Sequence, residues 1–122
     1  MESTYKYMKT NDQTGMTEMK IAYCIEAKEY VRAANLADKS GNKELRDAVC
    51  NVGLASYGKL VDRMERHSIG KNPTNLTAIA SVYAEMSTLC RIKGDAEAEK
   101  VYAAKKEAAD RECMSMISVK RE

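Results

Sequence analysis

The residues best suited to chemistry gather around the only histidine of the chain. Arg63, Arg66, His67 and Lys71 lie within one short stretch. Such a group of cations can bind an anion or an RNA phosphate. Positive charge at the carboxyl end of a helix is also stabilising by itself, because it complements the helix dipole. We therefore favour a basic helix end, name these four residues as the candidate binding site, and keep an RNA-related site as the alternative.

The spacing within this cluster differs from that of a known helical nuclease family. HEPN-type ribonucleases place their Arg and His farther apart than the three residues that separate Arg63 from His67. A catalytic thiol would need a base beside it, and the sequence pairs no cysteine with the one histidine. We assign no catalytic residue, so an enzyme remains the less favoured class.

The motifs that hold metals and cofactors are absent from the sequence. It has no Glu-x-x-His motif, which a di-iron bundle requires. It also has neither a GxxxxGK[ST] nor a GxGxxG phosphate loop. The four cysteines are far apart and form no CxxC motif: Cys24, Cys50, Cys90 and Cys113. We predict no metal, no cofactor, and free buried thiols of the kind found in a reducing cytoplasm.

Composition restricts the partners. The chain has 122 residues, enough for one hydrophobic core, and a net charge of only +2. A near balance of charges makes nucleic acid an unlikely partner. No apolar run approaches the roughly 20 residues that span a bilayer, and the first residues lack the apolar core of a secretory signal. We predict a soluble cytoplasmic protein with a flexible arm at 1–14, one helical domain at 15–118 and a polar tail at 119–122.

The residue types predict an all-α fold. Ala, Glu, Lys, Arg and Met are plentiful, and no alternating β-branched run suggests a strand. Apolar residues recur at helical spacing over four stretches: Thr14 to Ser40, Lys43 to His67, Pro73 to the residue before Gly94, and a last one from Asp95 to about Ser118. We expect four long antiparallel helices. A bundle and a stack of repeat-like hairpins are both compatible with them.

Turn residues separate these helices. Gly41 and Gly94 follow the last apolar residues of their helices, as glycine does where the backbone needs positive φ. Asn42, Asn72 and Asp95 are each placed to cap the next helix. Within the second helix, Gly53 and Gly58 indicate either close helix contact or a bend.

The last two helices resemble a tetratricopeptide repeat, a helix–turn–helix unit. Matching positions are Tyr83, Met86-Ser87, Gly94-Asp95, Ala98 and Tyr102. A fainter match covers Asn51 to Tyr57, with Ala27, Val31 and Ala34 as the end of a preceding unit. Ser87 replaces the usual glycine, one residue is missing after the turn, and the terminal proline is absent. The resemblance implies a peptide-binding groove between helices.

We predict a protein–protein interaction module that associates with itself. Several helices carry apolar rows on more than one side, which a single layer of helices leaves partly uncovered. The end of the last helix keeps an apolar tail, and we predict that it forms a two-fold homodimer contact through Cys113, Met114, Met116 and Ile117. Any other protein partner is unknown. The alternative is a helical-bundle enzyme or ligand-binding protein with an unrecognised site.

Overall fold

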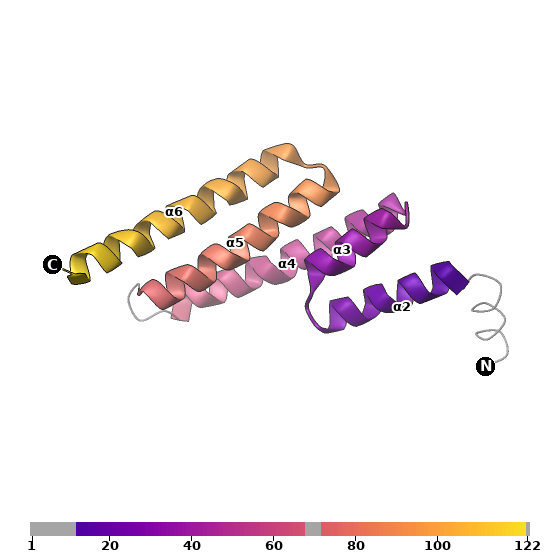
Figure 1. Cartoon of the computed structure of the whole chain (residues 1–122), viewed down its shortest axis with the longest axis horizontal. Helices are drawn as coiled ribbons and strands as arrows, with labels where there is room; N and C mark the ends of the chain where they lie inside the picture. The colour runs from indigo at the N-terminus through magenta and orange to yellow at the C-terminus, as the bar shows by residue number, and fades with distance from the viewer. Residues whose placement is uncertain (1–11, 68–71, 122) are drawn as a thin grey trace.

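A computed structural model describes residues 12–67 and 72–121, and all regular structure in them is α-helix. Five helices follow one another: α2 (Asp12–Glu26), α3 (Tyr30–Lys39), α4 (Lys43–His67), α5 (Pro73–Lys93) and α6 (Ala96–Arg121) (Figure 1). No strand occurs within these ranges, so the all-α prediction is confirmed. Most of the predicted amino-terminal arm lies outside the described residues, and α2 already begins at Asp12.

The prediction of one helix from Thr14 to Ser40 is wrong, because the chain turns after Glu26. Lys28 adopts a left-handed backbone conformation with φ of 62°. The N–H of Glu29 donates to the carbonyl of Cys24 at 2.7 Å, and the N–H of Lys28 donates to that of Ile25 at 3.0 Å. This pair of bonds is a Schellman motif, which normally has glycine in the left-handed position. The break lets α2 fold back and pack on α3.

The turns at Gly41 and Gly94, and the helix cap at Asn72, are those that the sequence predicts. Gly41 and Gly94 have φ of 80° and 89°. Each capping oxygen accepts a hydrogen bond from the backbone N–H three residues later: Asn42 from Leu45 at 3.0 Å, Asn72 from Asn75 at 2.8 Å, and Asp95 from Ala98 at 3.1 Å. These bonds satisfy donors that a helix leaves free at its start.

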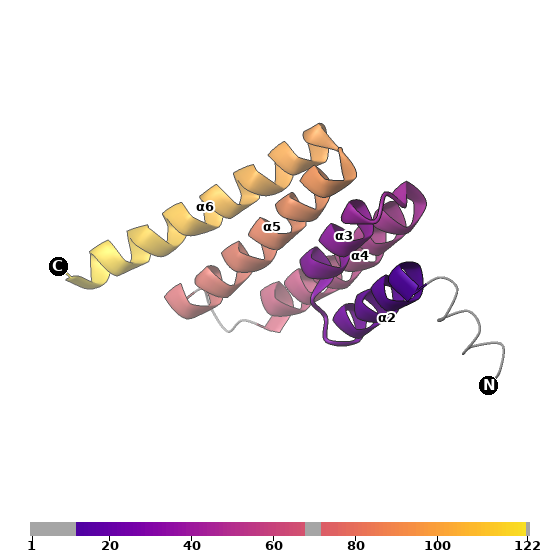
Figure 2. The ribbon, with the colours of Figure 1, turned by 45° about the vertical axis from the view of Figure 1, so that its right-hand side comes forward.

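The helices pack mainly in chain order. Each contacts the next, from α2 on α3 to α6 on α5, and α3 also packs against α5 (Figures 1 and 2). The central three helices, α3, α4 and α5, therefore contact one another. Helix α2 lies at one edge of this group and α6 at the opposite edge, which leaves α6 with α5 as its principal neighbour.

At Gly53 of α4, two neighbouring helices come close to the α4 backbone. A Cβ at this position would lie 2.7 Å from Tyr30 Cβ and 2.7 Å from Leu89 Cδ1, both closer than van der Waals contact. Glycine therefore permits α3 and α5 to reach the backbone of α4. The Tyr30 hydroxyl donates to Ser56 Oγ at 3.1 Å, and its ring meets Tyr57 edge-on with centroids 5.3 Å apart. One turn of α4 thus holds Tyr30 from three sides.

The apolar interior consists of two adjoining clusters. The first joins α2, α3, α4 and α5 around residues such as Ala33, Val49 and Leu89. The second lies toward the end of α4 and the beginning of α5, around Val61, Ile79 and Met86. Leu54 and Tyr57 pack against both clusters, so they make the interior continuous along α4.

We predict opposite effects of alanine at the two glycines of α4. Gly53→Ala should destabilise the protein by about 1–2 kcal/mol, because overpacking outweighs the better helix propensity of alanine. Gly58→Ala should stabilise it by up to about 1 kcal/mol, because a Cβ there meets no atom within 4 Å. Urea unfolding of the two variants measures the difference. Equal effects would show that α3 and α4 do not meet at Gly53.

We also predict that Lys28→Gly stabilises the turn between α2 and α3. A residue with a Cβ pays about 1–2 kcal/mol in the left-handed region, and glycine avoids this cost. About half of the gain in stability is lost again, because glycine gives the unfolded chain more conformational freedom. Lys28→Ala keeps the Cβ and should change the free energy of unfolding by less than about 0.5 kcal/mol. Denaturant melts of both variants test this. A loss of stability with glycine would mean that α2 and α3 form one continuous helix.

Candidate functional site

A groove with a volume of about 410 Å³ runs over α5, between α4 and α6. Its floor comes from α5, chiefly Leu76, Ile79 and Tyr83. Glu65 lines the side of α4, whereas Lys105, Ala108 and Glu112 line the side of α6. Because α6 packs mainly on α5 and not on α4, the two walls stand apart and the floor between them stays open.

The order of residues along each helix builds this hollow. Leu76, Ile79 and Tyr83 are three and four residues apart, so they lie on one face of α5. Leu76 and Ile79 are nearly buried, at 5% and 7% exposed, so of the three floor residues only the half-buried Tyr83 offers much surface to the groove. The small side chain of Ala108 is exposed and leaves the wall of α6 low.

Tyr83 lies at the centre of the polar contacts of the groove. Its hydroxyl donates to Glu65 Oε1 at 3.3 Å, which joins α5 to α4. Its ring stacks with Tyr102 of α6, with centroids 6.4 Å apart, and Lys105 Nζ lies 5.8 Å from the Tyr83 centroid. Burial, and then the nearby negative charge of Glu65, raise the pKa of Tyr83. The hydroxyl therefore stays protonated and acts as a hydrogen-bond donor, not as a base.

The structure places two residues of the predicted basic cluster, Arg63 and Arg66, outside this groove. Arg63 and Arg66 are exposed on α4 and form no ion pair with a described residue. Arg63 instead borders a second hollow together with Leu60 and Tyr57. His67 ends α4, but its side chain is outside the described part of the structure, as is Lys71. An anion site formed by all four therefore stays a prediction.

The predicted dimer contact of the α6 tail divides into two kinds of residue. Cys113 is only 8% exposed, and its Sγ lies 3.5 Å from Thr77 Oγ1 and from the carbonyl of Pro73. It belongs to the contact between α5 and α6 within the chain. Met114 is 62% exposed, and Met116 and Ile117 are half-buried. The dimer contact expected of the four residues stays a prediction.

All four cysteines are free and buried, as the sequence predicts. Burial raises the pKa of both the Cys50 and the Cys90 thiol. A nucleophilic cysteine requires the opposite shift, toward the thiolate. Neither thiol is therefore suited to covalent catalysis.

The described residues carry neither a metal-binding cluster nor a helix able to span a membrane. No group of three or more His, Cys, Asp or Glu side chains within 12–67 and 72–121 is arranged to hold a metal ion. Over the same residues, no helix combines the length and the apolar character needed to cross a membrane.

The groove is the feature that the sequence alone does not show. Tyr83 and Tyr102 stand out only as bulky positions of the repeat resemblance, and nothing in the spacing connects them to Glu65 or Lys105. These side chains come together because three helices meet, and each contact joins residues far apart in the chain. Only the apolar floor, with its helical periodicity, is visible as a pattern.

Comparisons with protein-family models, with curated proteins and with solved structures find no match for this chain. The resemblance to tetratricopeptide repeats therefore remains a prediction from the residues quoted for it.

We predict that two tyrosines weaken the fold in alkali. Burial is the main cause that raises the pKa of Tyr57 and Tyr83 above the usual value of 10.0, and Glu85 and Glu65 add to it. A raised folded-state pKa means that the stabilisation is complete below about pH 10 and is lost as the pH rises through the folded-state pKa. Tyr57→Phe and Tyr83→Phe should each flatten the fall in Tm above about pH 10.

The control for this experiment is Tyr23→Phe, since the Tyr23 side chain is 71% exposed. Thermal melts of the three variants and the wild type, measured across the same pH series, compare the slopes directly. Lysine titration contributes equally to all four curves. If the Tyr57 and Tyr83 variants follow the Tyr23 variant, the folded state does not hold these two protons.

Proposed function

We propose that this protein is a protein–protein interaction module that docks an amphipathic helix of a partner in the groove over α5. The observation that carries this proposal is the hollow of about 410 Å³ over α5, between α4 and α6, two helices that both pack on α5 without closing over it. Elongated apolar grooves between helices are a recurrent site for helical peptides. Their anchors are side chains spaced three and four residues apart, which is also the spacing of the floor residues.

The charges at the rim would fix the orientation of such a helix. Beside Tyr83, Glu65 gives the α4 wall a negative charge and Lys105 gives the α6 wall a positive charge, whereas Glu112 lines the α6 wall about two turns farther along. A docked helix with a cation on one flank and an anion on the other would match both walls. Charge pairs at a rim act mainly on orientation and on the choice of partner.

We further propose that α3–α4 and α5–α6 are two stacked, repeat-like hairpins. Contact between α3 and α5, the first helices of the two hairpins, supports this arrangement. In repeat proteins each unit packs on its neighbour and leaves grooves between units. Ser87, at the position of the usual repeat glycine, is close enough to α6 to donate from Oγ to the carbonyl of Glu99 at 3.2 Å.

A display library of short random peptides tests the proposed function. Selection on the wild type should enrich peptides with apolar residues at helical spacing. Ala108→Arg should weaken their binding by at least about tenfold, which is about 1.4 kcal/mol, because the new side chain fills the groove.

Ala104→Arg is the matched control, one turn earlier on α6, exposed, and outside the groove lining. It should leave peptide binding unchanged. Both variants should keep the wild-type Tm, since arginine is a good helix former at exposed positions. Peptides that bind the Ala108→Arg variant as tightly as the wild type would contradict the groove as the docking site.

A further inference from the structure

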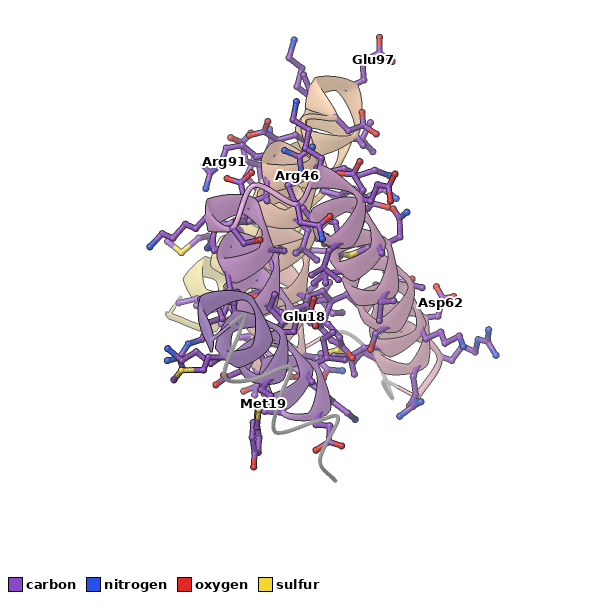
Figure 3. All side chains as sticks on the ribbon, turned by 90° about the vertical axis from the view of Figure 1, so that its right-hand side faces the viewer. Glu18, Met19, Arg46, Asp62, Arg91 and Glu97 are labelled. Carbon is purple, nitrogen blue, oxygen red and sulfur yellow. The ribbon has the colours of Figure 1, made fainter. Side chains whose placement is uncertain are left out.

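Helix α2 has two apolar faces, and only one of them packs within the described structure. Ile21 and Cys24, at 3% and 7% exposed, face α3 and belong to the first core cluster. On another side of the helix, Met16, Met19 and Tyr23 are 54%, 49% and 71% exposed. Figure 3 shows Met19 on the outer side of α2. We call these three residues the α2 stripe.

We propose that the α2 stripe of a second copy occupies the groove over α5, so that copies join head to tail. This inference rests on the proposed helix-docking function of the groove and names its partner. The stripe residues are three and four residues apart, which is the anchor spacing of a helix docked in a groove. Met16 and Tyr23 are seven residues apart, and so are Leu76 and Tyr83 of the floor. Each pair therefore spans about 10 Å along its helix.

Charge complementarity supports this pairing. With 100° of rotation per residue, Lys20 and Glu26 fall on opposite flanks of the α2 stripe. Neither forms an ion pair with a described residue. Beside Tyr83 the groove offers Glu65 on one wall and Lys105 on the other, the charges opposite to Lys20 and Glu26, and Glu112 lies about two turns farther along the Lys105 wall.

The same charges disfavour antiparallel pairing of two α2 stripes. In an antiparallel two-fold pair, each flank of α2 would face the same flank of its copy. Lys20 would then lie on the side of Lys20, and Glu26 on the side of Glu26. Like charges brought together in this way weaken association. The groove presents no such conflict.

The donor surface and the acceptor surface of this assembly are different. Contacts of this heterologous kind produce rings or open chains, whereas a two-fold contact stops at a dimer. We therefore expect the average mass of the wild-type protein to increase with concentration beyond that of a dimer, unless a small ring closes.

Two complementary variants test the proposal in the full-length chain. Met19→Glu disables the stripe and leaves the groove intact, whereas Ala108→Arg disables the groove and leaves the stripe intact. Each variant alone should associate at least tenfold more weakly than the wild type. An equimolar mixture should form a heterodimer and stop there, because one working stripe meets one working groove. Light scattering and sedimentation velocity at micromolar concentration measure the masses.

Ala22→Glu and Ala104→Arg are the matched controls, since both positions are exposed on the same helices but lie outside the stripe and the groove. Both should assemble as the wild type does. Circular dichroism of all variants confirms that each retains its helices.

Three results would overturn the proposal: a monomeric wild type, a mixture that does not recover association, or a dimer that neither variant affects. The last result would indicate another interface, and Met116→Lys with Ile117→Lys would then test the two-fold contact of the α6 tail. If the wild type is monomeric but selected peptides still bind the groove, only the head-to-tail assembly fails. If Ala108→Arg leaves peptide binding unchanged, the proposed function fails with it.

Discussion

Tyr30 packs directly on the backbone of α4 at Gly53, and the positions of the other helices depend on this contact. Any side chain at Gly53 would force α3 and α5 away from α4, because Tyr30 Cβ and Leu89 Cδ1 already fill the space of a Cβ. Tyr30 is also the first residue of α3, directly after the turn at Lys28. The packing of Tyr30 on α4 therefore determines where α3 begins and how α2 folds back along α3.

Tyrosine supplies the large aromatic rings that pack between the helices, since the chain has no Phe and no Trp. Each ring that packs between helices has a hydroxyl that needs a partner. Tyr30 donates to Ser56, Tyr57 to Glu85 Oε2 at 3.0 Å, and Tyr83 to Glu65. These rings consequently lie where the interior meets the rim. At Tyr83, this placement puts an aromatic floor and a carboxylate side by side in the groove.

The proposed docking groove and the exposed face of α2 have a common physical origin. Helices that pack mostly on their neighbours in the chain, as here, leave the outer sides of the first and last helices uncovered. At one edge this exposes the α2 stripe, and at the other it leaves α6 standing apart from α4. In our proposals, the exposed helix face and the unfilled groove complement each other between copies.

The sequence by itself determined the helical class, the glycine turns at Gly41 and Gly94, the three helix caps and the free thiols. These features are local: a cap accepts a bond from three residues ahead, and Gly41 and Gly94 mark positive φ because they lack a Cβ. The floor of the groove was visible in part, as the periodic apolar face of α5.

Long-range contacts decided the rest. Lys28 adopts the left-handed conformation that glycine normally takes, and no residue beside it marks this turn in the sequence. The turn is there because the packing of Tyr30 on α4 at Gly53 fixes where α3 starts. Glu65, Tyr83 and Lys105 became neighbours only when α4, α5 and α6 met, since helical periodicity specifies which face a residue occupies but not which helix lies opposite.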